Sequence, residues 1–439
     1  MFSRARLRSM ADYFAATRNE VAVDEMFIAL SKMNTAKVGY FPRVPTWIGL
    51  ASHRPYLTRT LSRIARAAWL AGGWGLFFIW EYLKFYRLHR SIGTLTPTET
   101  DGAILGLSTR VCDIVTPTKF PAFPQTWLTL PWAPQLCLPK GARELPMLSI
   151  LEGSDLLSAL VDALTVTHRM KRDRSLSPWV MQTYTAYRWF LVRRAVDRLS
   201  GTLVMTEHYD RWAVLVDRAV RERRRAQGCI DYLVVVQHGA MGALNEDENF
   251  GESLLNLPTR LRQVDELHAY NSDEAAAFRA NVFGLGKVSR ALEVCFFKPT
   301  IELMGEVISN RPRILFVGHP LCESFHIQVF RKLTTWKIFE IYYKPHPKGP
   351  MSASAEAVNW KIIKEEKIFP RVDLLISYPS TLVIEYENVG IPASVHPLDV
   401  GIDELTKFLE KTRALVLEKC AEYFAGNNFS HMSPPRLID

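Results

Sequence analysis

Two groups of polar residues in the middle of the chain follow apolar runs that are typical of buried strands. The stretch TEHYD places Glu207, His208 and Asp210 just after the run that ends at Met205. A carboxylate or an imidazole in such a position can take a proton from a hydroxyl group. Asp210 has a structural alternative, because aspartate is a common N-cap of a helix such as the one expected next.

The second group, Gln237, His238 and Gly239, follows the run DYLVVV. A histidine that emerges from a buried strand, beside a glycine that lets a ligand approach the backbone, favours a functional loop over a histidine packed in the core. The core position remains the alternative. We expect a functional loop around His238, lined by His208, Gln237 and Gly239.

The third group lies in the stretches FVGHP and YYKPHPKGP, again where apolar runs end. Lys344 and a histidine at position 346 can present N–H groups to phosphate oxygens. The flanking prolines restrict the backbone before a ligand binds and so lower the cost of ordering it. These features predict a phosphate site at Lys344 and His346, with Gly318 and His319 lining the same cleft. A simple turn is the alternative, because proline often follows a strand.

The fourth group lies in SYPSTLVIEYENVG, where a strand should give way to a helix. The hydroxyls of Ser380 and Thr381, with the first N–H groups of the helix, would form an anion site. Glu385 follows Thr381 by one helical turn, so its carboxylate could accept hydrogen bonds from ribose hydroxyls. Helix capping by Ser380 is the structural alternative.

The elements that must position these residues alternate between short apolar strands and helices from about residue 201 onward. Such alternation predicts an α/β fold with parallel sheets, in which ligands bind beyond the carboxyl ends of the strands. We expect two Rossmann-like domains, residues 101–287 and 288–425, facing a cleft. A helical, basic and aromatic-rich region (1–100) would precede them, and a tail (426–439) would follow. The prolines of residues 116–146 predict a connection without a long helix or a central strand.

Length and composition exclude several classes of protein. A chain of 439 residues with 48% hydrophobic and 23% charged residues should fold into more than one domain. The net charge of +9 comes largely from the first 90 residues and from residues 168–225, which favours either a phosphate-bearing partner or a solvated basic face. No nucleic-acid recognition module accompanies this charge, so we do not expect a nucleic-acid partner.

The cysteines and acidic residues bear on location and on metals. The six cysteines form no C-x-x-C pair, which argues against a disulfide framework and a structural zinc site and favours a reducing compartment. Because charges interrupt the N-terminal stretch MFSRARLRSMADYFAATRNE, we expect no export signal and a cytoplasmic protein. The sequence contains no D-x-D motif, so we expect no catalytic metal and no cofactor.

The uncharged stretch AAWLAGGWGLFFIW, residues 67–80, is flanked by basic residues. Its 14 residues would span only about 21 Å as a helix, whereas the hydrocarbon layer is roughly 30 Å thick. Tryptophans with basic flanks suit a helix at a membrane surface. A helix buried between domains is the second interpretation.

Taken in order, the motifs QHG, NSDEAAAF, ILFVGHP, YYKPHP and DLLISYPSTLVIEYENVGIP resemble those of a known group of enzymes. The stretch from about residue 195 to 400 is similar to bacterial GT-B glycosyltransferases that build capsules and other surface polysaccharides. These include the polysialyltransferase and Kdo-transferase type. It also resembles the related CDP-glycerol polyol-phosphate transferases of teichoic acid synthesis. The first 190 residues share none of this likeness.

The resemblance implies an inverting, metal-independent transferase that uses a nucleotide-linked donor and releases CMP. In it, His346, Ser380 and Thr381 would bind the donor's phosphate in the 288–425 domain, and 101–287 would bind the acceptor. His238 matches the base of the polyol-phosphate branch. The acidic pair followed by glycine of the sialyl branch is absent, which leaves Glu207 and Asp210 as alternative bases.

The same likeness suggests a glycan or glycolipid acceptor at the inner face of the cytoplasmic membrane. Two alternatives stay open. The chain could transfer a polyol phosphate from a CDP-linked donor, or it could be a non-catalytic scaffold at the membrane surface that retains a degenerate GT-B fold.

Overall fold

The computed structural model describes most of the chain in two compact units. The described residues are 4–33, 38–93, 102–108, 111–116, 118–133, 136–227, 231–241, 255–284, 291–304, 311–335, 339–347, 351–365 and 367–426. Unit 1 comprises Met1–Met26, Gly39–Arg43 and Arg59–Phe297, and unit 2 comprises Phe27–Val38, Val44–Thr58 and Lys298–Asp439. Each unit is described by itself.

Unit 1 contains a seven-stranded sheet in the order β3-β2-β1-β4-β5-β6-β7, in which every pairing is parallel. Its central strands are short apolar runs buried on both faces, as expected when helices cover a parallel sheet. The strands are β1 (Gly102–Leu105), β2 (Thr126–Thr129), β3 (Arg143–Pro146), β4 (Thr202–Met205), β5 (Tyr232–Val236), β6 (Glu266–Ala269) and β7 (Glu293–Phe296).

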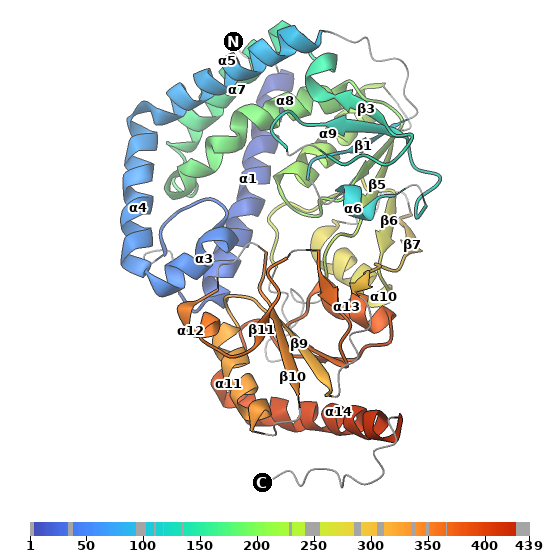
Figure 1. Cartoon of the computed structure of the whole chain (residues 1–439). Coiled ribbons are helices and arrows are strands. Elements are labelled where there is room, and N and C mark those ends of the chain that lie inside the picture. The colour runs from blue at the N-terminus through green and yellow to red at the C-terminus, as the bar shows by residue number, and fades with distance from the viewer. Residues whose placement is uncertain are drawn as a thin grey trace. The chain divides into compact units, whose positions relative to one another are not determined.

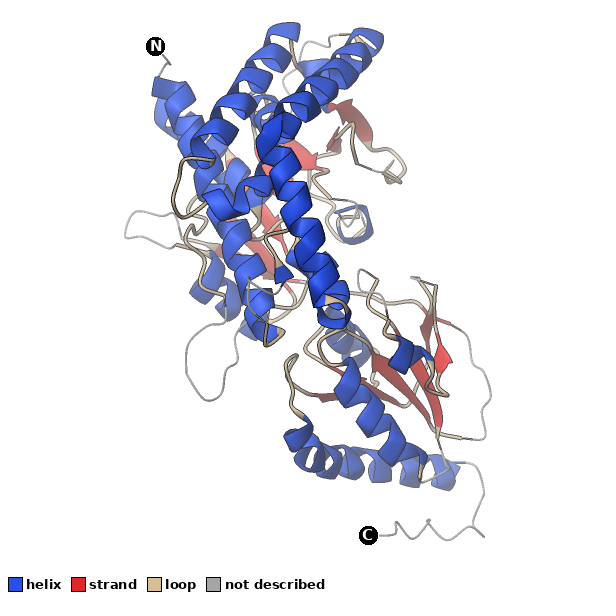
Figure 2. Ribbon diagram, turned by 90° about the vertical axis from the view of Figure 1, so that its left-hand side faces the viewer, coloured by secondary structure: helices blue, strands red, loops and turns tan. Residues whose placement is uncertain are grey.

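Helices accompany this sheet, and Figure 2 shows how large a share of the chain they form. Those between the strands are α6 (Val111–Ile114), η2 (Met147–Ile150), α7 (Gly153–Met170), η3 (Ser177–Thr185), α8 (Ala186–Asp197), α9 (Arg211–Gln227), α10 (Ser272–Ala277) and η5 (Phe278–Val282). Of the N-terminal helices, α1 (Arg4–Leu30), α4 (Pro55–Ala68), η1 (Trp69–Gly73) and α5 (Trp74–Ile92) lie wholly or largely in unit 1, whereas α3 (Val44–His53) belongs to unit 2. Within unit 1, α5 packs on α7, and α8 packs on both α7 and α9.

Ion pairs hold the start of α1 in unit 1. Asp12 pairs with Arg193 at 3.3 Å and with Arg221 at 3.2 Å, and Glu20 pairs with Arg211 at 3.1 Å. Arg193 and Arg211 are buried, so removing one partner of such a pair would leave a charge inside the protein. Much of the positive charge of residues 168–225 is therefore structural. These buried ion pairs correct the interpretation of residues 168–225 as a solvated basic face.

The proline-rich stretch contains a strand inside the sheet, contrary to the prediction from residues 116–146. β2 is only four residues long and fits between Pro124 and Pro131. It pairs with β1 on one side and β3 on the other. Proline excludes a strand only where it removes a ladder hydrogen bond, and here both prolines lie outside the paired residues.

Unit 2 contains a five-stranded parallel sheet in the order β11-β10-β9-β13-β14 and a small two-stranded sheet (Figure 1). β9 lies between β10 and β13, so the carboxyl ends of these three strands are neighbours. The strands are β8 (Leu303–Met304), β9 (Arg313–Val317), β10 (Glu340–Lys344), β11 (Lys361–Ile362), β12 (Phe369–Pro370), β13 (Leu374–Ser377) and β14 (Ala393–Val395). The helices are α11 (Glu323–Thr334), α12 (Ala353–Glu356), α13 (Thr381–Asn388), η6 (Ile402–Glu404) and α14 (Leu405–Gly426).

The core of unit 2 is aromatic. The rings of Tyr343 and Trp360 stack at 4.1 Å, and Phe316 lies 5.9 Å from Trp360. α11 and α14 contact each other, and α14 also contacts β13 and β14. The predicted alternation of strands and helices is thus confirmed, and the chain is an α/β protein whose two parallel sheets are compatible with Rossmann-like domains.

The structure places the division between units after Phe297 and not at residue 288. The reason is β7, which pairs with β6 and completes the sheet of unit 1. The region 1–100 does not form a separate domain, since parts of it belong to each unit. All of the tail except Gly426 lies outside the described residues. None of the helices in the described part of the chain combines the length and the apolar character needed to cross a bilayer.

Candidate functional sites

The first candidate site lies in unit 1, where the adjacent strands β4 and β5 end. The ring of His238 hydrogen-bonds through Nδ1 to the carbonyl of Thr206, and Nδ1 also lies 3.1 Å from Nε2 of His208. A carbonyl oxygen can only accept, so Nδ1 of His238 carries the proton and Nε2 carries the lone pair. The side chain is half-buried, which suits a base that must meet a substrate.

His208 orients His238. Its Nε2 accepts a hydrogen bond from the backbone N–H of His238 at 3.1 Å. The two rings lie 4.1 Å apart, and the edge of Phe278 packs against His208 at 4.7 Å. Because His208 is buried and held from both sides, it fixes the position of a ring that is itself accessible. A base oriented by a third group is the arrangement that activates hydroxyl acceptors in many enzymes.

Glu207 places at this site a carboxyl group whose pKa is raised well above its ordinary value. Burial, followed by the charge of Asp210, raises the pKa of Glu207 to about 8, although a hydrogen bond from Ser108 opposes the shift. One carboxyl oxygen, Oε2, is buried and has no hydrogen-bond partner among the described residues. The carboxyl is therefore neutral near pH 7, and its pKa is close to the range in which general acids and bases work best.

Asp210 has a structural role at this site. The carboxylate of Asp210 accepts hydrogen bonds from the N–H groups of Trp212 at 2.9 Å and Ala213 at 3.0 Å, so it caps α9 as the alternative interpretation foresaw. Burial and the nearby Glu20 raise the pKa of Asp210 to about 7.

Gln237 is fully buried and acts as a brace for the loop that carries His238. Its side chain donates to the carbonyl of Gly239 at 2.9 Å and accepts from the N–H of Tyr270 at 2.9 Å. The loop's second support is Glu274, whose carboxylate accepts from the N–H of Met241 at 2.7 Å. Gln237 thus holds the loop of His238 in place from inside the protein, whereas Gly239 is half-buried beside His238.

The second candidate site lies in unit 2, at the neighbouring carboxyl ends of β10, β9 and β13. The ring of His319, after β9, lies 5.1 Å from that of His346, after β10, and 5.2 Å from that of Tyr378, after β13. Nδ1 of His319 accepts the N–H of Leu321 at 3.2 Å, so the proton of the neutral ring lies on Nε2. Burial and the neighbouring His346 lower the pKa of His319 to about 3. His319 is thus a neutral hydrogen-bond donor at any physiological pH.

Ser380 and Thr381 lie at the same edge of this sheet, at the start of α13. The hydroxyl of Ser380 lies 3.1 Å from that of Ser377, the last residue of β13, and makes no capping hydrogen bond. The capping alternative for Ser380 is therefore wrong. Both Ser380 and Thr381 are half-buried at the start of α13, where the first N–H groups of a helix have no partner within the helix.

Lys344 is directed elsewhere. Its ammonium group donates to the backbone carbonyls of Glu365 at 2.8 Å and Ile368 at 2.9 Å and lies 4.5 Å from the centre of the Phe369 ring. The side chain is nearly buried in this position. These contacts give Lys344 a structural role in joining β10 to the segment before β12, and we leave it out of the candidate site as a correction.

Gly318 has a packing role. For Glu385, the structure gives the position on α13 but does not test the predicted contact with a ribose. A Cβ atom at position 318 would lie 2.2 Å from the hydroxyl oxygen of Tyr343, so only glycine fits against this ring. Glu385 is half-buried on α13, one turn after Thr381, and its contact with a ribose stays a prediction. The sequence did not point to Ser108 or Tyr378, because β1 was not expected and tyrosine is common after strands.

Within the described part of the chain, two groups of side chains could hold a metal ion. Cys322, His326 and His396 are buried in unit 2, and Glu266, His268 and Cys295 are partly exposed in unit 1. A cavity of about 120 Å³ in unit 1 is separate from both candidate sites, because it is lined by residues between Ile104 and Ala142, including Phe120, Trp127 and Lys140.

Comparisons with known proteins leave the family open. No family model and no curated protein matches the chain. Among solved structures, it is similar in part to the Glycosylation Associate Protein (Gap123) complex from Streptococcus agalactiae. The identity is 12%, the match covers 54% of this chain and 56% of that chain, and the TM-score is 0.28. The match thus spans about half the length of that solved chain, and the function must be argued from the two candidate sites.

Proposed function

We propose that the protein is an inverting, metal-independent glycosyltransferase of the GT-B type. It would move a sugar from a nucleotide donor, CMP-linked by the resemblance of its motifs, to a membrane-associated polysaccharide or glycolipid. Unit 2 would bind the donor and unit 1 the acceptor. The observation that supports the proposal most is the accessible ring of His238, which Thr206 and His208 hold in the tautomer of a base.

The donor's phosphate would bind in unit 2. His319 offers a neutral Nε2–H, His346 offers a second imidazole, and Ser380 and Thr381 offer hydroxyls beside a helix N-terminus. Neutral donors and a helix dipole stabilise the charge that develops on a leaving phosphate without a metal ion. These donors follow three adjacent strands, β10, β9 and β13, so the sheet fixes their spacing.

The acceptor's hydroxyl would lose its proton to Nε2 of His238. The imidazolium that forms would be stabilised by the Thr206 carbonyl, which already accepts from Nδ1. Inversion requires only one such displacement. Glu207, neutral near pH 7, would hydrogen-bond to an acceptor oxygen as a donor, because Oε2 has no partner among the described residues.

Polyol-phosphate transfer from a CDP-linked donor is the second candidate reaction. It uses the same base and phosphate site, so the two reactions differ only in the group that is moved. Incubation with CMP-linked sugars and with CDP-glycerol, followed by analysis of the released nucleotide and of the product, separates them. Under either reaction, replacing His346 by Ala should abolish CMP release. Undiminished polymer synthesis by the His346→Ala variant in cells would favour a non-catalytic scaffold instead.

Attachment to the inner face of the membrane is proposed from α5 and α7. The outer face of α5 carries an apolar stripe at helical spacing: Leu76, Ile79, Trp80 and Leu83, of which Leu76 is 75% and Trp80 55% exposed. The opposite face packs inward through Phe78 and Phe85. α7, which packs against α5, also exposes two apolar side chains, Leu157 and Val161.

Basic residues near this apolar stripe favour an anionic membrane surface as its partner. Lys84 lies 5.6 Å from the Trp80 ring, and Arg87 and Arg90 are exposed further along the helix. An apolar stripe with cationic neighbours matches a bilayer with anionic headgroups. The protein should therefore sediment with anionic vesicles but not with neutral ones. Leu76→Ser with Trp80→Ser should abolish this binding, whereas Ile402→Ser, at an exposed apolar residue of unit 2, should leave it unchanged. Equal sedimentation of all three proteins would contradict the attachment.

A further inference from the structure

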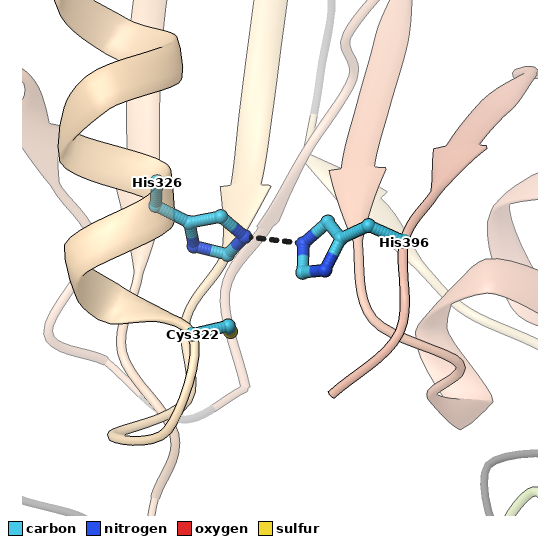
Figure 3. Close-up of side chains that lie close together, drawn as sticks. All are labelled: Cys322, His326 and His396. Atoms are coloured by element: carbon cyan, nitrogen blue, oxygen red, sulfur yellow. Dashed lines mark hydrogen bonds between the residues drawn. The ribbon is translucent and has the colours of Figure 1, made fainter. Parts of the chain in front are cut away.

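Three potential metal ligands converge inside unit 2, away from solvent. Cys322 is the N-cap residue of α11, His326 lies one helical turn later, and His396 follows β14 (Figure 3). The three are 0%, 0% and 2% exposed, and their ligand atoms lie within 4.8 Å of one another. Residues four apart on a helix share one face, so Cys322 and His326 present their ligand atoms to the same side.

The two histidines already point their Nε2 atoms at each other, 2.7 Å apart. Nδ1 of His396 donates to the carbonyl of Pro397 at 2.8 Å, which leaves the lone pair of His396 on Nε2. Metal-binding histidines usually have this arrangement, with one ring nitrogen on the metal and the other on a backbone carbonyl. The Pro397 carbonyl thus fixes both the tautomer and the direction of the ring.

A proton shared between the two rings does not account for the whole cluster. If Nε2 of His326 donates to His396, then Nδ1 of His326 is an acceptor buried without a hydrogen-bond partner among the described residues. The Cys322 thiol donates to the carbonyl of His319 at 3.5 Å, a weak hydrogen bond because a thiol is a weak donor. The surroundings are apolar and aromatic, with Phe316 and Phe325 within 5.2 Å of the histidine rings. Three polar groups in such a place are costly unless something binds them together.

We propose that Cys322, His326 and His396 bind a zinc ion. Imidazole nitrogens and a thiolate are the ligands that zinc prefers. The ion would bind Nε2 of both histidines, the proton of His326 would move from Nε2 to Nδ1, and the thiol proton would be released to solvent. The position opposite the three ligands is left for a fourth, which the described cysteine, histidine and acidic side chains do not supply.

The site would tie α11 to the end of β14 and would steady the loop from Gly318 to Cys322, which carries His319. It is a structural site in a closed core and takes no part in the transfer reaction proposed above. Its presence would correct the expectation that the scattered cysteines exclude a structural zinc site. The zinc site does not depend on the proposed transferase function, so either proposal can fail without the other.

The test uses the full chain, purified without metal-affinity chromatography. We expect about one zinc per chain by mass spectrometry, a fall in melting temperature on chelation, and recovery on addition of Zn²⁺. Cobalt in place of zinc should give the near-ultraviolet charge-transfer band of a thiolate ligand. Cys322→Ser should lose that band and bind zinc at least ~10-fold more weakly.

Cys295→Ser is the matched control, because Cys295 belongs to the other candidate cluster, in unit 1. It should keep both the band and the zinc. Loss of the band in Cys295→Ser with its retention in Cys322→Ser would assign the metal to unit 1 and overturn the proposal. Should Cys322→Ser fail to fold, the wild-type protein still decides, since absence of the thiolate band or of any stabilisation by Zn²⁺ would also overturn it.

Discussion

Glu207 should make the protein less stable as the pH rises. The folded state holds its carboxyl with a pKa of about 8, against an ordinary value of 4.5. Between these values the folded state binds a proton that the unfolded state has lost, so the free energy of unfolding falls with increasing pH. The contribution is fully present below about pH 4.5 and is lost as the pH passes about 8.

The size of the effect follows from the window of about three and a half pH units. One group can change the free energy of unfolding by at most about 1.4 kcal/mol per pH unit, so the total is on the order of a few kcal/mol. Glu207→Gln keeps an oxygen that can accept from Ser108 but does not titrate. Relative to wild type it should be of similar stability at pH 5 and more stable by a few kcal/mol at pH 9.

The assay is urea denaturation of both proteins at five pH values from 5 to 9, with the difference between their midpoints as the readout. Glu302→Gln serves as the control, because Glu302 is exposed and its replacement should leave the pH dependence unchanged. Asp210→Asn, which preserves a capping side chain, should move the transition to lower pH by removing the neighbouring charge. A difference between wild type and Glu207→Gln that does not vary with pH would refute the reasoning.

Three further substitutions test individual roles. His238→Asn retains an N–H near the position of Nδ1, so it should keep the bond to Thr206 yet lose about 10²–10⁴-fold in turnover, as measured by nucleotide release. A variant as active as wild type would remove His238 from the chemistry. Lys344→Met should cost about 1 kcal/mol or more in urea, because the carbonyls of Glu365 and Ile368 lose their charged donor, while CMP affinity stays within about threefold. A large loss of CMP affinity with unchanged stability would return Lys344 to the phosphate site. Gly318→Ala should destabilise unit 2 by about 1–3 kcal/mol, since its Cβ would meet the Tyr343 hydroxyl; unchanged stability would show that the ring moves freely.

The strand ends that carry the candidate residues could be predicted from the sequence. The runs before Thr206, Gln237, Gly318 and Tyr378 consist mostly of apolar residues, and such runs are typical of strands buried on both faces. Parallel pairing then brings their carboxyl ends to one edge of each sheet. The grouping of His319 with His346 follows from this rule alone.

Side-chain directions could not be predicted in the same way. Lys344 follows a strand like the other candidates, but its long stem reaches the carbonyls of Glu365 and Ile368, more than twenty residues away in the chain. Asn271 caps α10, although Ser272 beside it has an equally suitable capping side chain, so the sequence pattern alone does not choose between them. β2 was missed because the prolines around it hid a strand of only four residues.

The buried arginines and the three residues of the proposed zinc site also have partners that the local sequence does not reveal. Arg193 and Arg211 look like surface charge in the sequence and become buried partners of α1 only in the fold. The Cys-x-x-x-His spacing of 322 and 326 was visible, whereas His396 joins them only because β14 lies beside β13. Long-range partners of this kind depend on sheet order, which local patterns do not specify.

The central claim is that the neighbouring ends of β9, β10 and β13 bind a nucleotide's phosphate. Calorimetric titration of the full chain with CMP and with cytidine tests it most directly, because the two ligands differ only by that phosphate. We predict that CMP binds at least ~10-fold more tightly than cytidine, and that the difference disappears in His346→Ala combined with Ser380→Ala. Equal affinity for the two ligands in the wild-type protein, or no binding of either, would contradict the account.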